Sequence, residues 1–302
     1  MGTWRASRLG KLPPYLFVEI DRAKAAAIEA GRDVIDFGVG DPDRPTPAFI
    51  VERMSAALRD ASNHRYPLGR GKRAFRQCVA AFFQKRFGVA LDPDREIAAL
   101  LGSKEGIGHF STAVLNPGDL ALVPDPGYPV YISGAVFSEA KYHRMPLREE
   151  RGFLPDLAAI PSDVLRSAKL MWLNYPNNPT SACAPLSFFE EALAFARKHD
   201  LLIAQDAAYS ETYYESPPPS ILLPGAKERC VEFHSLSKTF NMTGWRAGFV
   251  AGNAEAVGAL ADVKSNLDSG LFGAIQDAVI EGLSRIAHPD VRGILGVYRE
   301  RR

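Results

Sequence analysis

Cysteine is scarce in this sequence of 302 residues, which contains only Cys78, Cys183 and Cys230. An odd number of widely separated cysteines forms neither a disulfide framework nor the spacing of a metal site. Long apolar runs are also missing, and the first residues lack the apolar core of a signal peptide. These absences exclude disulfide-rich secreted proteins and membrane-spanning proteins, and they predict a cytoplasmic protein in a reducing environment.

An excess of charge of either sign is missing as well. The 36 Lys and Arg residues nearly balance the 35 Asp and Glu residues, which leaves a formal net charge of +1. Such a balance favours neither nucleic acid nor an anionic membrane, so we expect neither as a partner. Residues 37–42 are rich in glycine but lack the third glycine of the dinucleotide-binding fingerprint.

The sequence does contain short apolar runs that alternate with helical patterns. Residues 185–198 form a helical pattern with an apolar side. Runs typical of buried strands occur at residues 97–101, 120–123, 170–173, 201–204, 231–234 and 248–251. The alternation predicts an α/β fold, a three-layer sandwich in which helices cover both faces of a mostly parallel sheet. Ligands of such sheets bind beyond the carboxyl ends of the strands.

Two helices are expected before the first strand. An Ala-rich stretch predicts a helix over residues 21–30, which Gly31 ends. Thr46 and Pro47 predict the cap and the first position of a second helix. This second helix is expected to face the core with four apolar residues, Ile50, Val51, Met54 and Leu58.

Residues 235–246, with the sequence SLSKTFNMTGWR, carry the most informative pattern. Lys238 stands between small hydroxyl residues, and Arg246 follows about two helical turns later. A lysine can bind an aldehyde as a Schiff base, and Ser235, Ser237 and Arg246 can hold a phosphate beside it. A surface lysine in a loop is the alternative, and it would be the better interpretation of an isolated Ser-x-Ser-Lys.

Further polar residues follow the predicted strands. Asp206 could pair with a pyridine nitrogen, and Tyr209 could reach a hydroxyl of the same ring. Asn178 could donate an amide hydrogen bond, and Tyr128 could stack on a flat ring. Each residue has a structural alternative: a helix cap or turn for Asp206, a plain loop for Asn178, and a packed tyrosine on a rigid turn for Tyr128.

Residues 102–106, with the sequence GSKEG, join a predicted strand to a predicted helix. Backbone amides at the start of a helix can bind an anion, so a phosphate could rest there. The segment is not a P-loop, because Gly-Lys-Ser/Thr is absent.

The order of these segments along the chain resembles the fold-type I, pyridoxal-phosphate-dependent aminotransferases of class I and II. The most specific segments are residues 175–180, 206–209 and 235–246. Within that family the chain looks most like the LL-diaminopimelate aminotransferase group, through residues 12–17, 38–43, 102–107 and 125–131. The resemblance implies pyridoxal 5′-phosphate as cofactor, an amino acid and a 2-oxo acid as substrates, a role in lysine biosynthesis, and a homodimer with shared active sites.

The resemblance also implies roles for individual residues. Lys238 would be the catalytic Schiff-base lysine, while Asp206 would pair with the ring nitrogen. Tyr209 and Asn178 would bond to the ring oxygen, and Tyr128 would stack on the ring. The phosphate would be held by Ser103, Lys104, Ser235, Ser237, Arg246 and the partner subunit's Tyr66, with Asn266 near the same interface. The substrate would meet Tyr15, Gly40, Lys104, Tyr128 and Asn178.

The resemblance divides the chain into three parts. Residues 1–45 would form an N-terminal arm and the start of a small domain, and residues 46–288 the cofactor-binding large domain. Residues 289–302 would begin a helix that connects to a C-terminal small domain, which we expect to be missing here. In the family that domain carries the arginine that holds the substrate's α-carboxylate. We assign this role to none of Arg299, Arg301 and Arg302.

A second departure from the family pattern is Ser181, which stands where glycine is usual after Asn-Pro-Thr. A positive φ at this position would be mildly strained for serine.

Three functions remain open on the sequence. The first is an aminotransferase that moves an amino group from an amino acid to a 2-oxo acid. The second is another pyridoxal-phosphate enzyme, such as a β-lyase, because the same cofactor site serves both reactions. The third is a truncated cofactor-binding protein with impaired or no catalysis, which the short C-terminus suggests.

Overall fold

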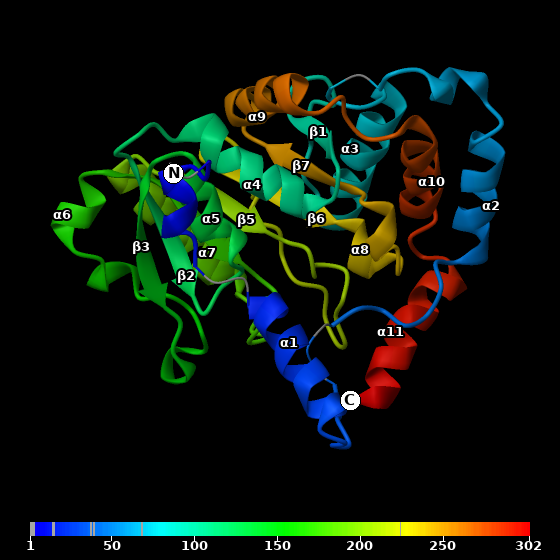
Figure 1. Cartoon of the computed structure of the whole chain (residues 1–302). Coiled ribbons are helices and arrows are strands. Elements are labelled where there is room, and N and C mark those ends of the chain that lie inside the picture. The colour runs from blue at the N-terminus through cyan, green and yellow to red at the C-terminus, as the bar shows by residue number, and fades with distance from the viewer. Residues whose placement is uncertain (1–3, 14–15, 37, 39, 68, 224) are drawn as a thin grey trace.

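The computed structural model describes residues 4–13, 16–36, 38, 40–67, 69–223 and 225–302. Its described strands form one sheet at the centre of the molecule (Figure 1). They are β1 (Ile97–Leu100), β2 (Leu120–Asp125), β3 (Lys141–Pro146), β4 (Ala168–Asn174), β5 (Leu202–Asp206), β6 (Cys230–Ser235) and β7 (Gly248–Gly252). The order across the sheet is β1-β7-β6-β5-β4-β2-β3.

The sheet is mostly parallel, as predicted. Strands β3, β2, β4, β5 and β6 run in one direction, whereas β7 is antiparallel to both β1 and β6. Strand β3 was not among the predicted strands, because its sequence, KYHRMP, contains no apolar run. It lies at the edge of the sheet, where only Met145 of its residues is buried.

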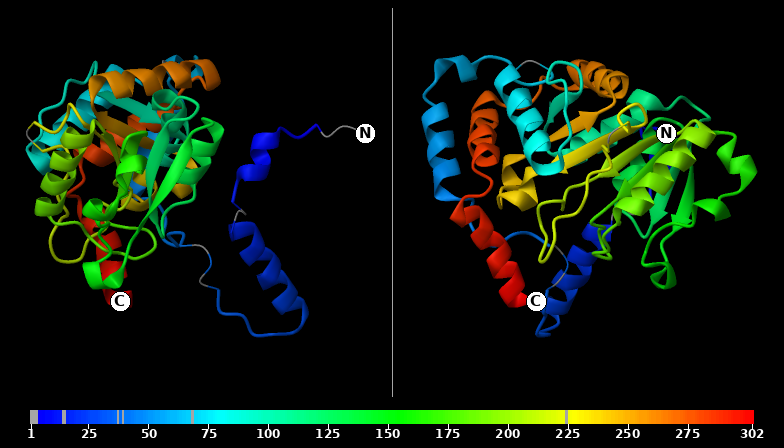
Figure 2. Two further views of the ribbon diagram at one scale, coloured as in Figure 1. Left: turned by 90° about the vertical axis from the view of Figure 1, so that its left-hand side faces the viewer. Right: turned by 180° about the vertical axis from the view of Figure 1, so that it is seen from behind.

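Helices cover both faces of the sheet and produce the predicted three layers (Figures 1 and 2). One face carries α4 (Ser103–Val114), α5 (Val130–Phe137) and α9 (Ala254–Leu267). The other carries α3 (Arg73–Phe87) and α7 (Leu186–His199), while α10 (Gly273–Ser284) packs on α3 and α2 (Ala48–Ala57) packs on α10. Strand β4 shows why both faces need helices, because its alternate side chains point to opposite faces. Leu170 and Trp172 pack in the apolar cluster under α4, α5 and α9, and Met171 and Leu173 pack in the cluster on the other face.

Shorter elements and the two end helices complete the described chain. They are α1 (Leu16–Glu29), α6 (Ser162–Leu165), α8 (Leu236–Thr239), α11 (Pro289–Arg301), and the 3₁₀ helices η1 (Ser7–Lys11), η2 (Ala61–His64), η3 (Glu149–Arg151), η4 (Leu157–Ala159) and η5 (Thr243–Trp245). No described helix has both the length and the apolar character needed to cross a membrane.

The N-terminal arm stands apart from the sheet and its helices in the left view of Figure 2. Helix α1 begins five residues earlier than predicted, at Leu16, and Gly31 follows it with a φ of 71°. At the other end of the chain, Arg301 holds the arm through two hydrogen bonds to Asp43, of 2.9 and 2.8 Å.

Helix α2 differs from the prediction at its start and along its apolar side. Pro47 occupies the N-cap position, and the Thr46 hydroxyl donates to the carbonyl of Asn241 at 2.9 Å rather than to the start of the helix. Ile50 is buried, but Val51 and Leu58 are 41% and 46% exposed. The helix packs mainly against α10, so its buried stripe is narrower than the sequence pattern suggested.

Candidate functional site

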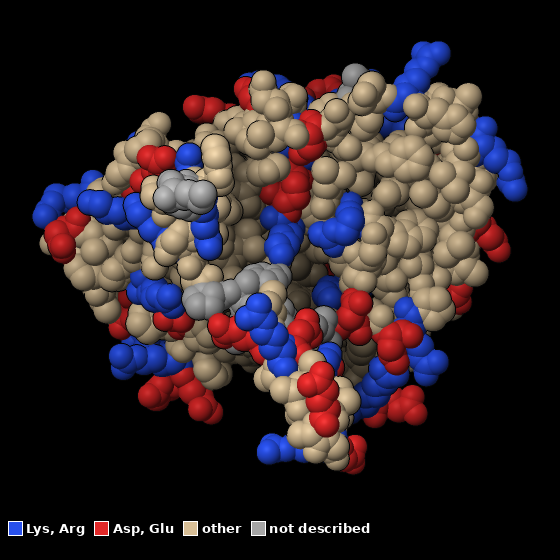
Figure 3. Space-filling model, viewed as in Figure 1, with Lys and Arg blue, Asp and Glu red and all other residues tan. Residues whose placement is uncertain are grey.

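The ends of three neighbouring strands bring the predicted site residues together. Strands β4, β5 and β6 end at Asn174, Asp206 and Ser235, and the register pairs Asn174 with Asp206. Because these strands are parallel and adjacent, their carboxyl ends meet at one edge of the sheet. Figure 3 shows Lys and Arg side chains around a hollow near the centre of the face seen in Figure 1.

Asp206 is a buried carboxyl group at this edge, only 5% exposed. The Tyr131 hydroxyl donates to its Oδ2 at 2.8 Å, and the Ala208 backbone amide donates to its Oδ1 at 3.2 Å. Burial raises the pKa of Asp206 to about 6, although both hydrogen bonds act in the opposite direction. Both donors are neutral, so the carboxylate is suited to receive a cationic group such as a protonated pyridine nitrogen.

The raised pKa of Asp206 predicts a pH-dependent effect on stability. The folded protein holds this proton more tightly than the unfolded chain, so ionisation of Asp206 lowers the free energy of unfolding as the pH rises from about 4 to about 6. We expect Asp206→Asn to raise the free energy of unfolding of the cofactor-free protein by about 1–3 kcal/mol at about pH 8, but little at about pH 4. Urea unfolding at both pH values measures this. An equal gain at both would show that ionisation is not the cause.

Asn174 and Tyr131 were not predicted as site residues, yet both support Asp206. The Asn174 side-chain amide donates to the backbone carbonyl of Asp206 at 2.9 Å, and its Oδ1 accepts from the Asn178 backbone amide at 2.8 Å. Asn174 therefore fixes the loop of Asn178 against the end of β5. Asn174 could have been predicted as a site residue, because it is a polar residue at the end of an apolar run. Tyr131 could not, because its position beside Asp206 depends on how α5 packs against the sheet.

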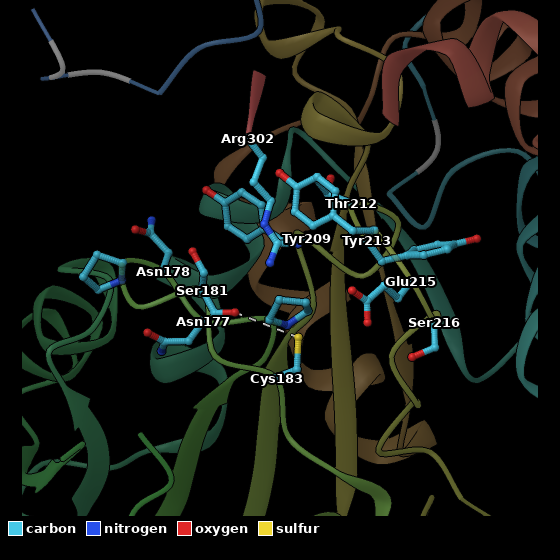
Figure 4. A pocket seen from close by; sticks show the side chains of 13 residues that line it. Asn177, Asn178, Ser181, Cys183, Tyr209, Thr212, Tyr213, Glu215, Ser216 and Arg302 are labelled. Carbon is cyan, nitrogen blue, oxygen red and sulfur yellow. Dashed lines mark hydrogen bonds between the residues drawn. The ribbon is translucent and has the colours of Figure 1, made fainter. Parts of the chain in front are cut away.

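A cavity of about 490 Å³ lies beyond the ends of β4 and β5 (Figure 4). Asn178 and Tyr209 both line it. Burial, together with the charge of Asp206, raises the pKa of Tyr209, so its phenol keeps the proton that it would donate. Arg302 also lines the cavity, and its guanidinium lies 4.9 Å from the centre of the Tyr214 ring.

Lys238 lies in the short helix α8, directly after strand β6. Ser235 caps this helix, because its hydroxyl oxygen accepts from the backbone amide of Ser237 at 3.3 Å. The Lys238 ammonium donates to the carbonyl of Gly40 at 2.8 Å, which places the N-terminal arm beside it. Burial lowers the pKa of Lys238, and the charge of Arg246 lowers it further against the opposing charge of Asp41. This environment favours the neutral amine that reacts with carbonyl groups.

A cradle for an anion forms where Arg246 meets the start of α4. Gly102 precedes this helix with a φ of 78°, and a Cβ at that position would lie 2.9 Å from the guanidinium carbon of Arg246. Gly248 of β7 lies close to the first residue of α4, since a Cβ placed at Gly248 would lie 2.9 Å from the backbone nitrogen of Ser103. Glycine at both positions lets a guanidinium and the backbone amides that begin a helix approach one point, which suits a phosphate.

The remaining predicted residues are more peripheral in a single chain. Tyr128 is half-buried, with its ring edge-to-face against Tyr131 at 5.9 Å. Lys104 is exposed, and so is Tyr66, at 89%. Asn266 is exposed too, and its amide donates to the carbonyl of Asp262 in its own helix at 2.8 Å. Tyr15, predicted to meet the substrate, lies outside the described residues.

Ser181 adopts the left-handed conformation that its position suggested, with a φ of 63°. Its backbone amide donates to the Asn177 carbonyl at 2.8 Å and closes the loop that carries Asn178. We expect Ser181→Gly to raise the free energy of unfolding by about 0.5 kcal/mol, because glycine adopts this φ without strain. Ser181→Ala is the control and should bring no gain. Loss of stability in the glycine variant during urea unfolding would show that the strain is negligible.

Comparison with known proteins shows the family of this chain. The model of the aminotransferase class I and II family matches residues 32–290. The chain therefore belongs to the aminotransferase class I and II family, and membership implies a pyridoxal 5′-phosphate cofactor.

The curated relatives narrow the similarity. The chain is 53% identical to the LL-diaminopimelate aminotransferase of Aquifex aeolicus over 299 residues, which covers 98% of this chain and 77% of the relative. It is 50% identical to the enzyme of the same name from Moorella thermoacetica over 301 residues, which covers 98% and 76%. This chain thus spans about three quarters of the length of both relatives.

Solved structures share the fold over nearly the whole chain. Substrate-bound BacF from Bacillus subtilis superposes with a TM-score of 0.93 at 39% identity, covering 100% of this chain and 76% of that one. A probable N-succinyldiaminopimelate aminotransferase from Thermus thermophilus gives a TM-score of 0.87 at 41% identity, covering 94% and 77%.

Proposed function

We propose that this aminotransferase moves an amino group from LL-diaminopimelate to 2-oxoglutarate. Identity of about one half to enzymes of that name, over almost all of this chain, supports the choice of substrate. The observation that carries the chemistry is the arrangement of the site. Buried Asp206 ends β5, and the amine of Lys238 follows β6. The cradle lies where Gly102 follows β1 and Arg246 precedes β7, at the same edge of the sheet.

The residues present fit pyridoxal 5′-phosphate. Asp206 would hold the pyridine nitrogen, and Tyr209 and Asn178 would bond to the ring oxygen while Tyr128 stacks on the ring. The phosphate would be held by Ser103, Lys104, Ser235, Ser237 and Arg246. When bound, the cofactor supplies an electron sink for the charge that develops on the amino acid's α-carbon.

Proton transfer in the reaction falls to Lys238. Its neutral amine would accept the proton from the α-carbon of the amino acid and return it on the cofactor's side. The lowered pKa of Lys238 makes this neutral form easier to reach than in a fully solvated lysine. The hydrogen bond to the Gly40 carbonyl shows that the amine reaches the N-terminal arm, where Gly40 and Tyr15 would meet the substrate.

We propose a homodimer with shared active sites. The 89% exposure of Tyr66 and the exposure of Asn266 support this, because both residues lie at the surface, where a partner subunit could contact them. We further propose that residues 46–288 form the cofactor-binding domain behind an arm of residues 1–45, that residues 289–302 begin a connecting helix, and that the protein acts in the cytoplasm. Light scattering should give twice the chain mass; the mass of one chain would contradict the dimer.

A substrate panel tests the proposed function. Cofactor-loaded protein is mixed with LL-diaminopimelate and 2-oxoglutarate, and glutamate is measured; the meso isomer and N-succinyl-LL-diaminopimelate serve as competing donors. We expect glutamate mainly with the LL isomer. Glutamate mainly with the N-succinyl donor would reassign the substrate. Pyruvate and ammonia released from an amino acid without any acceptor would indicate a lyase, and cofactor binding without turnover would indicate a non-catalytic protein.

A further inference from the structure

Lys264 is a fully buried lysine whose role is not explained by the site described above. It lies on α9, and its side chain is 0% exposed. Its ammonium lies 3.0 Å from both carboxylate oxygens of Glu105 and 3.3 and 3.1 Å from those of Asp268. Burial of a lysine charge lowers the free energy of unfolding unless the ammonium is paired in this way. The partner on α4, Glu105, links Lys264 to the helix that begins at the cradle.

Glu105 is the third residue of α4, the helix whose first turn forms the anion cradle. Its Oε2 accepts from the backbone amide of Leu101 at 3.1 Å, and its Oε1 lies 2.7 Å from Nδ1 of His109. Burial alone would raise the pKa of Glu105, but the contact with His109 and the charge of Lys264 outweigh it, and the pKa is lowered. Glu105 is therefore a carboxylate at neutral pH.

The carboxylate of Glu105 stabilises helix α4 but weakens the binding of an anion at the start of that helix. A negative charge in the first turn satisfies a backbone donor and interacts well with the helix dipole. The same charge repels a phosphate at that helix terminus. Gly102, which leaves room for Arg246 in the cradle, directly follows Leu101, whose backbone amide donates to Glu105. The field at the cradle therefore depends on how well the charge of Glu105 is neutralised.

We propose that Lys264 is a positioning residue for the cofactor's phosphate, which acts by cancelling the charge of Glu105 beside the cradle. The inference rests on the proposed function, because the anion is the phosphate of pyridoxal 5′-phosphate. Oxygen and nitrogen atoms of Glu105, His109 and Asp268 lie within 4.8 Å of one another, as in a metal site. The ammonium of Lys264 already bonds to both carboxylates and takes the place of a cation there.

Two ligands separate this electrostatic role from a structural one. Pyridoxal 5′-phosphate and pyridoxal carry the same aldehyde, but only the first carries a phosphate. We expect Lys264→Met to weaken binding of pyridoxal 5′-phosphate about tenfold or more, and to leave binding of pyridoxal unchanged within about twofold. Absorbance titration of the cofactor-free full chain gives both dissociation constants.

Two further variants keep the test sharp if Lys264→Met destabilises the protein. Glu105→Gln should bind pyridoxal 5′-phosphate as tightly as the unaltered chain or more tightly, because it removes the repulsive charge. Lys264→Met combined with Glu105→Gln should recover most of the affinity that Lys264→Met loses. Both results are specific to charge, because neither substitution restores the original packing.

Several outcomes would overturn the inference. Equal weakening of both ligands by Lys264→Met would indicate a structural role alone, and so would a double variant that binds no better than Lys264→Met. An unaltered chain that binds pyridoxal but not pyridoxal 5′-phosphate would contradict the cradle itself. An unaltered chain that binds neither would instead overturn the proposed function, and this inference with it.

Discussion

Lys238→Ala should lower the rate of amino transfer by at least about 10³-fold. Proton transfer by a positioned side chain contributes about 10²–10⁴-fold to a rate, and loss of the amine removes the covalent attachment of the aldehyde as well. In this structure the amine of Lys238 is half-buried, has a lowered pKa and contacts the N-terminal arm. Alanine has no amine that could accept the proton from the α-carbon of the amino acid.

The comparison variant is Lys198→Ala, because Lys198 is an exposed lysine on α7. Steady-state kinetics should show an unchanged kcat/KM for this control. Cofactor binding by Lys238→Ala should remain measurable, since Asp206 and the cradle are intact, and a small primary amine added to the solution should restore part of the rate. Lys238→Ala protein with full activity would show that Lys238 is not the proton-transferring residue.

Asp206→Asn should lower the rate of amino transfer by about 10²–10³-fold. A carboxylate keeps the pyridine nitrogen protonated, and a preorganised charge in a buried site typically contributes this much to a rate. Asparagine keeps the size and can still bond to Tyr131 and Ala208, but it carries no charge. Asp206→Glu retains the charge at an altered distance and should keep more activity than Asp206→Asn.

The stability of the same variant makes this prediction more specific. Asp206→Asn should be less active and yet, without cofactor, more stable at about pH 8, because burial of the charge costs stability in the folded protein. Opposite effects on activity and stability are typical of a functional residue. Asp163→Asn, an exposed position on α6, is the control for both measurements. Parallel losses of activity and stability would indicate a structural role for Asp206.

Much of the fold could be predicted because central strands are apolar on both faces. Residues 170–173 show this best, since alternate side chains enter the two apolar clusters. Edge strand β3 could not be predicted, because a strand with one neighbour needs no apolar run. The buried stripe of α2 was predicted too wide, because its width depends on contact with α10, which is distant in sequence.

The candidate site was predictable only where a motif names its chemistry. The motif at residues 235–246 predicted a reactive lysine and a phosphate-binding arginine. In the structure, Arg246 lies beside Gly102 at the start of α4. The supporting contacts of Asn174, Tyr131 and Lys264 join positions 32–159 residues apart. No local pattern encodes such contacts, because they arise when strands and helices pack.

Reductive trapping tests the central claim most directly. Protein loaded with pyridoxal 5′-phosphate is treated with borohydride, digested, and mapped by mass spectrometry. We expect the reduced cofactor on the peptide that contains Lys238, and no such label in Lys238→Ala protein. Label on another lysine, such as Lys104, in the unaltered protein would contradict the assignment of Lys238 and the mechanism built on it.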